Sequence, residues 1–120
     1  MHPFPPAADL QCFVGDAIAQ VSLDPYGVQF SFESLRRLVA ELRIEQTEPN
    51  GTVWSYDCKA AEGPPLVLHR LLYRRIVEVE REDLRLTFRI EDGSALAVLS
   101  ELGPYESGNI EAPETGVVVF

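Results

Sequence analysis

The sequence predicts a mainly β protein, α+β at its margin, folded as a single domain. Apolar and polar residues alternate with the period of two that is typical of half-buried strands. Turn sequences such as Asp24-Pro25-Tyr26-Gly27 and Asp92-Gly93 separate the alternating segments. A chain of 120 residues is long enough for one core and short for two domains. We therefore expect one β-rich domain over residues 10–120, after an irregular N-terminal arm over residues 1–9, which contain three prolines.

The first half of this domain, residues 10–44, predicts a short helix and three strands. Residues 19–23 and 28–32 alternate on either side of the first turn, which indicates a hairpin. Residues 36–44 also alternate, although the apolar side chains of residues 35–42 fit helical spacing too. A helix there would leave an isolated hairpin, which is marginal in water, so we favour a third strand.

The second half repeats this pattern. Thr52–Cys58 is rich in β-branched and aromatic residues and predicts a strand, whereas residues 66–73 follow two prolines and predict a short helix. Three alternating segments come next, at residues 77–79, 84–90 and 94–99.

Apolar positions of the two halves correspond at an offset of 58, which becomes 56 after the first hairpin. At the first offset, Leu10, Phe13 and Ile18 match Leu68, Leu71 and Ile76. We therefore expect two related helix-plus-three-strand meanders, about residues 10–44 and 68–99, in one curved sheet or a small barrel.

The C-terminal region begins with a turn-rich passage over residues 102–110. Gly116–Phe120 is an apolar run that predicts a buried terminal strand. Because an exposed apolar strand invites edge-to-edge pairing, this strand lies either inside the sheet or against a second copy of the chain. The second alternative predicts a homodimer.

The acidic composition narrows the classes of partner. Ten Lys and Arg against nineteen Asp and Glu leave a net charge of −9, and Lys59 is the only lysine. This balance disfavours nucleic acid, which needs a basic surface, and favours a basic protein partner. No apolar run predicts a membrane span or a signal peptide, so we expect a cytoplasmic location, with Cys12 and Cys58 as free, packed thiols.

Residues with catalytic chemistry are few. Cys58 and His69 form the one conceivable nucleophile and base, but neither lies in a nucleophile-elbow or oxyanion-loop sequence. No spacing indicates a zinc, calcium or phosphate site, so we expect no metal and no cofactor. The acidic run at residues 78–83 is explained by cross-strand ion pairs between Glu78 or Glu80 and the arginines at positions 85 and 89.

Four residues form the candidate binding surface. Trp54 and Tyr56 share one face of their predicted strand, where aromatic side chains serve either as core or as interface anchors. Tyr105 and Glu106 lie in the turn-rich passage and are either a structural corner or a contact site.

Two segments carry a resemblance: Gly-Asp-Ala-Ile-Ala-Gln-Val-Ser-Leu at residues 15–23 and Tyr-Glu-Ser-Gly-Asn-Ile at residues 105–110. Together with the two half-repeats, they resemble a family of small bacterial proteins of similar length, over most of residues 10–120. The resemblance implies no activity, cofactor or catalytic residue.

These observations predict a non-catalytic protein-binding module of a bacterial cell. A sharper form is an immunity-type antidote to a basic partner, by analogy of size and charge. The alternatives are a small-ligand-binding domain, with its pocket between the two halves near Trp54, Tyr56 and the phenylalanines, and an enzyme that uses Cys58 and His69.

Overall fold

The computed structural model describes residues 2–60, 62–65 and 67–120; Met1 of the predicted arm, Ala61 and Leu66 of the predicted helix lie outside the described residues. The strands are β1 (Ile18–Asp24), β2 (Gly27–Phe32), β3 (Arg37–Ala40), β4 (Arg43–Thr47), β5 (Val53–Asp57), β6 (Ile76–Glu82), β7 (Arg85–Ile90), β8 (Ala95–Leu99), β9 (Gly108–Ala112) and β10 (Gly116–Val119). The mainly β class predicted from the sequence is confirmed.

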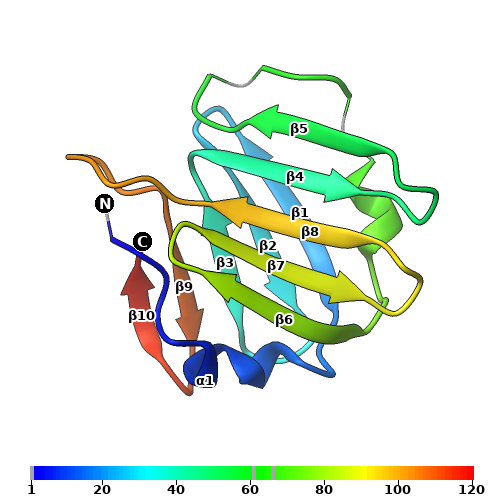
Figure 1. Ribbon diagram of the computed structural model, residues 1–120, viewed down its shortest axis with the longest axis horizontal. Helices are drawn as coiled ribbons and strands as arrows, with labels where there is room; N and C mark the ends of the chain where they lie inside the picture. The colour runs from blue at the N-terminus through cyan, green and yellow to red at the C-terminus, as the bar shows by residue number, and fades with distance from the viewer. Residues whose placement is uncertain (1, 61, 66) are drawn as a thin grey trace.

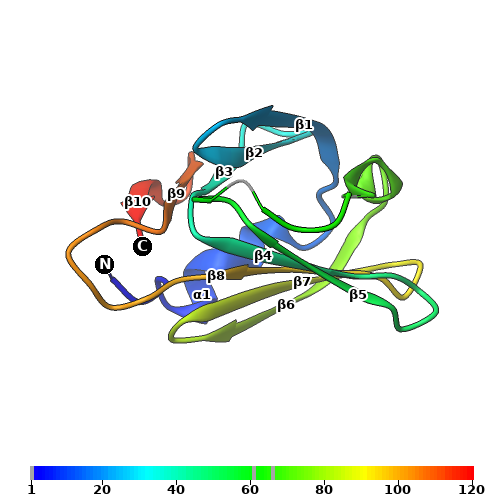
Figure 2. The same cartoon turned by 90° about the horizontal axis from the view of Figure 1, so that it is seen from above.

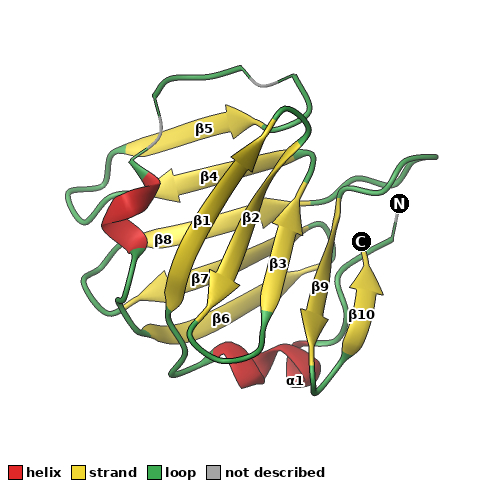
Figure 3. Cartoon of the chain, turned by 180° about the vertical axis from the view of Figure 1, so that it is seen from behind, coloured by secondary structure: helices red, strands yellow, loops and turns green. Residues whose placement is uncertain are grey.

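The strands form two antiparallel sheets of five strands, in the orders β1-β2-β3-β9-β10 and β5-β4-β8-β7-β6. The sheets lie face to face as two layers (Figures 1 and 2). Their strands cross instead of running parallel (Figure 3), as in orthogonal sheet packing. The described strands therefore form two separate sheets, and neither closes into the barrel that was one predicted form.

Each sheet contains one of the predicted meanders: β1-β2-β3 in the first and β6-β7-β8 in the second. Helix α1 (Ala7–Leu10) and the 3-10 turn η1 (Gln11–Phe13) precede the first meander, and η2 (Leu68–Leu71) precedes the second. No helix within the described ranges is long and apolar enough to cross a membrane.

Backbone hydrogen bonds join the beginnings of the two meanders, and two of these bonds correspond to each other. The Gly15 N–H donates to the Ile76 carbonyl, and the Tyr73 N–H donates to the Ile18 carbonyl, both at 2.8 Å. Both donors have a positive φ, 88° at Gly15 and 62° at Tyr73. These two positions are 58 residues apart, the offset at which the apolar residues also correspond. The two-layer arrangement is thus fixed where each meander begins.

Phenylalanine rings fill the space between the layers. Phe13 lies 4.9 Å from Phe32 and 5.4 Å from Phe88, measured between ring centroids. The small-ligand pocket predicted between the two halves is therefore occupied by packed side chains at this place.

Residues 36–44 form strand and not helix, but two strands instead of the single one predicted. The chain leaves the first sheet after β3, passes through Glu41 and Leu42, and enters the second sheet as β4. Two bonds satisfy the backbone of this link, since the Glu41 N–H donates to the Ser107 carbonyl (2.8 Å) and the Leu42 carbonyl accepts the Cys58 N–H (2.9 Å).

Both chain ends differ from expectation. The arm predicted over residues 1–9 is not irregular throughout, because α1 begins at Ala7 and Phe4 is buried against Phe120, with 4.4 Å between ring centroids. The terminal strand β10 lies at the sheet edge and not inside the sheet, and it pairs with β9, a strand that the turn-rich composition of residues 102–110 concealed.

Candidate functional site

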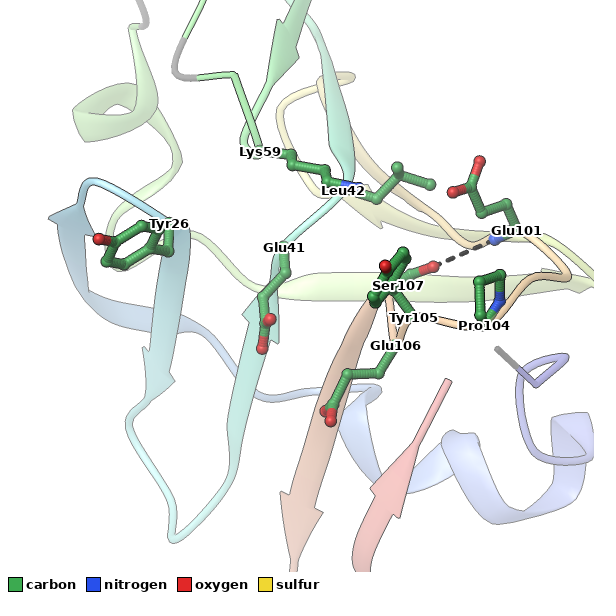
Figure 4. Close-up of a pocket in the computed structure, with 9 residues that line it drawn as sticks. All are labelled: Tyr26, Glu41, Leu42, Lys59, Glu101, Pro104, Tyr105, Glu106 and Ser107. Atoms are coloured by element: carbon green, nitrogen blue, oxygen red, sulfur yellow. Dashed lines mark hydrogen bonds between the residues drawn. The ribbon is translucent and has the colours of Figure 1, made fainter.

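A pocket of about 540 Å³ opens where the tip of the first meander faces the β8–β9 loop (Figure 4). Its walls come from four separate segments of the chain. The lining residues are Tyr26 of the β1–β2 turn, Glu41 and Leu42 of the β3–β4 link, Lys59 after β5, and Glu101, Pro104, Tyr105, Glu106 and Ser107 of the β8–β9 loop.

Ser107 holds one side of this pocket in place. It is buried, and its N–H donates to the Phe120 carbonyl at 2.6 Å. Its carbonyl accepts the Glu41 N–H at 2.8 Å, and its Oγ accepts the Glu101 N–H at 3.1 Å. Ser107 therefore ties the β8–β9 loop to both the C-terminus and the β3–β4 link.

Lys59 is positioned by its neighbour. The Cys58 side chain is 1% exposed, and the Cys58 N–H donates to the Leu42 carbonyl, so the backbone at this point is anchored beside the pocket. From that anchor the Lys59 Nζ lies 5.0 Å from the centroid of the Tyr105 ring. This distance is within the range of a cation–π contact.

The carboxylates of the pocket act on one another. Burial raises the pKa of Glu41, and the negative charges of Glu106 and Asp24 raise it further. Figure 4 shows the Glu41 and Glu106 side chains directed to the same side of the pocket. A positive charge placed between them would relieve this repulsion.

The arrangement combines carboxylates with the exposed faces of two tyrosines. Tyr26 is 78% and Tyr105 70% exposed, so both rings are accessible to a ligand. Aromatic faces and carboxylates together are the groups that recognise ammonium and guanidinium ions in proteins. The described groups that line the pocket therefore suit a cationic ligand.

The structure divides the predicted binding surface. Tyr105 and Glu106 line the pocket, whereas Trp54 and Tyr56 lie elsewhere. The Trp54 Nε1–H donates to Glu48 at 2.8 Å, and Arg70 pairs with the same carboxylate. The hydrogen bond from Trp54 lowers the pKa of Glu48 despite the opposing effect of burial, and Arg70 lowers it further. Trp54 is therefore engaged in a structural contact, and Tyr56 packs against the core.

The sequence alone does not indicate Tyr26, Glu41 and Lys59 as pocket residues. Tyr26 lies in the predicted turn at residues 24–27, and Glu41 lies in the strand predicted over residues 36–44. For Lys59 the sequence holds one indication of a special position, because it is the only lysine in a chain with nine arginines.

Cys58 and His69 are the one conceivable nucleophile and base in the sequence. Burial, helped by the negative charge of Asp57, raises the pKa of Cys58 to about 12, which disfavours the thiolate form that a Cys58–His69 pair would need at neutral pH. Within the described ranges, no group of three or more His, Cys, Asp or Glu side chains is placed to hold a metal ion.

The predicted ion pair between Glu80 and Arg89 is confirmed at 2.7 Å, but Arg85 pairs with Glu45 of β4 at 3.0 Å. Cys12 is half-buried and not fully packed; it lines a second, open depression whose Arg36 already pairs with Asp16 and Glu114.

Comparison with protein-family models, with curated proteins and with solved structures found no match to this chain.

Proposed function

We propose that this protein is a non-catalytic binding module that associates with a basic protein partner. The observation that carries the proposal is the pocket, which is lined by two exposed tyrosines together with Glu41 and Glu106. An arginine or lysine side chain of the partner would enter this pocket and serve as the anchor of the interface.

The net charge of the whole molecule also supports association with a basic partner. The net charge of −9 attracts a basic partner over several ångströms, which raises the rate of association at low salt. Within the pocket, a bound cation would also lower the free energy of the ionised Glu41, whose pKa is raised by its surroundings. An immunity-type antidote that caps a basic toxin in the bacterial cytoplasm is the specific form of this function that we favour.

The test uses a capped tripeptide, acetyl-Gly-Arg-Gly-amide, titrated into the ¹⁵N-labelled protein at low salt. We expect shifts in the amide signals of residues 104–107 and a dissociation constant that Glu106→Gln weakens about two- to fivefold. Glu78→Gln removes the same charge from β6, outside the pocket lining, and should change binding much less. An absence of binding, or equal effects of the two variants, would contradict the proposal.

A small-ligand function is the second candidate, because about 540 Å³ is within the range of small-molecule sites. Agmatine, which carries a guanidinium group but no peptide backbone, separates the two functions. If agmatine binds more tightly than the tripeptide, the pocket serves a small amine. If affinity instead increases with peptide length, the pocket serves a protein.

We also propose that β10 joins two copies of the chain. This edge strand has no charged residue, and its Val117 side chain is 66% exposed. Antiparallel pairing of β10 with its copy would complete its unpaired edge. Sedimentation velocity should show a dimer that Val117→Lys converts to a monomer; a wild-type chain that is monomeric at high concentration would contradict this.

A further inference from the structure

We propose that Lys59 is a resident cation of the pocket, which lies over one face of the otherwise exposed Tyr105 ring in the free protein and is displaced from it when a partner's basic side chain binds. The inference rests on the proposed function, because it names how the same pocket selects and admits its ligand. It makes Lys59 the residue that sets the affinity and the specificity of the site.

The contacts of the ten cationic side chains set Lys59 apart. All nine arginines form ion pairs with carboxylates within 4.0 Å. Lys59, in contrast, places its Nζ 5.0 Å from the Tyr105 ring centroid, inside a pocket that three glutamates line. An ammonium group over an aromatic face, with carboxylates nearby, is the arrangement that a bound basic side chain would adopt.

The backbone on both sides of Lys59 is held in place, whereas the end of the Lys59 side chain is not. Cys58 is buried, and the Asp57 carboxylate accepts the Ala60 N–H at 2.9 Å, so the backbone on both sides of Lys59 is held. Lys59 itself is exposed and has a flexible side chain of four carbons. The ammonium can therefore leave the ring without any movement of the backbone.

The strength of the contact permits this exchange. An exposed cation–π contact changes an equilibrium by only about two- to fivefold, so a stronger cation can replace it. A guanidinium group is more weakly hydrated than an ammonium group, stacks on aromatic rings and binds carboxylates through two parallel hydrogen bonds. Arginine should therefore displace Lys59 more readily than lysine does.

The experiment follows Lys59 directly. Because the chain has one lysine, its Cε–Hε groups give a single, unambiguous NMR signal. In the free protein we expect the Tyr105 ring to shift this signal upfield, and Tyr105→Leu should abolish that shift. Saturation with acetyl-Gly-Arg-Gly-amide should return the signal to its random-coil position.

Affinity gives the second measurement. Lys59→Ala should tighten the binding of this tripeptide about two- to fivefold, since the ligand no longer competes with an internal cation. Arg89→Gln changes the net charge equally on the second sheet, at a side chain paired with Glu80, and should tighten binding much less. Acetyl-Gly-Lys-Gly-amide should bind more weakly than the arginine peptide to both wild type and Lys59→Ala.

The outcomes separate the inference from the function beneath it. If the tripeptide binds while the Lys59 signal stays in place, or if Lys59→Ala matches Arg89→Gln or weakens binding, the displacement is wrong and the binding function stands. If no variant binds either peptide, the proposed function itself is wrong, and the inference with it.

Discussion

The tips of the two meanders have opposite surroundings, although the strands that lead to them are alike. The β1–β2 tip is uncovered, with Tyr26 largely exposed at the pocket. The β6–β7 tip is covered by the N-terminal segment, where the Phe4 N–H donates to the Asp83 carbonyl at 3.0 Å. Arg81 donates from Nε to the Pro5 carbonyl at 3.1 Å and from Nη2 to the Phe4 carbonyl at 2.7 Å.

Because of this difference, we expect the β6–β7 tip to affect stability and the β1–β2 tip to affect the proposed binding. The covered tip contributes to the folded state, because its backbone and Arg81 make hydrogen bonds to the N-terminal segment within the chain. The uncovered tip leaves its aromatic and acidic groups available to a partner. Substitutions at the two tips should therefore act on different measurements.

Phe4→Ala should have the largest effect on stability. The Phe4 ring is 2% exposed and packs on Phe120, and removal of a buried phenylalanine ring costs about 3–5 kcal/mol. Tyr26→Ala removes a ring of similar size from the uncovered tip and should stay within about 0.5 kcal/mol of wild type. Urea denaturation measures both, and equal losses would show that the tips do not differ in this way.

Gly108→Ala should have the second-largest effect and lower the free energy of unfolding by roughly 3 kcal/mol, because backbone strain and overpacking act together. Gly108 ends the loop that faces the open tip; its φ is 154°, and a Cβ there would lie 2.1 Å from the Val39 carbonyl oxygen. Gly93 is the matched control in the second meander, since its φ is 90° but nothing lies within 4 Å of an added Cβ. Gly93→Ala should cost only about 1–2 kcal/mol, so thermal unfolding isolates the close approach at Gly108.

Arg81→Met should lower the free energy of unfolding by about 1–2 kcal/mol. The substitution keeps an apolar stem but leaves the Phe4 and Pro5 carbonyls without the guanidinium donor. Arg37→Met provides the comparison, because Arg37 pairs with Glu111 on the exposed face of the first sheet and should cost at most about 1 kcal/mol. A loss at Arg37 as large as that at Arg81 would contradict the covered-tip interpretation.

Local alternation predicted both hairpins and β8, and the enrichment of Thr52–Cys58 in β-branched and aromatic residues predicted β5. The division of residues 36–44 between two sheets was not predicted, because Leu38, Ala40 and Ile44 keep the same alternation on both sides of the break. Strand β9 was concealed by Gly108, Asn109 and Pro113, although Ile110 is fully buried. Where a strand leaves its sheet depends on partners that are distant in sequence.

Of the residues that line the pocket, the sequence indicated only Tyr105 and Glu106, and the other members depend on tertiary structure. Tyr26 becomes a pocket residue because its tip stays uncovered, and the prolines of the N-terminal segment did not indicate that Phe4 would cover the other tip. Trp54 was expected to serve either as core or as an interface anchor, and in the structure its indole N–H donates a hydrogen bond to Glu48.

The smallest expected effect concerns the charge of Glu41, which lies in the β3–β4 link beside the uncovered tip. Burial, then Glu106 and Asp24, raise the pKa of Glu41 in the folded chain above its ordinary value of 4.5. The folded chain therefore holds this proton more tightly than the unfolded chain does, and the linked stability is present below the unfolded pKa and lost as pH rises through the folded pKa. Glu41→Gln should remove this pH dependence. The variant should therefore be more stable than wild type above the folded pKa, by less than about 1 kcal/mol at pH 7, and equally stable below the unfolded pKa.

Glu106→Gln should reproduce part of that advantage, because Glu106 is one source of the raised pKa of Glu41. The double variant should then gain less than the sum of the two single variants, since each removes the same repulsion. Urea denaturation in steps from pH 4 to pH 8 measures all three chains. Additive gains would mean that the two carboxylates do not interact, and the pocket would then lack the paired negative charge that the proposed cation binding requires.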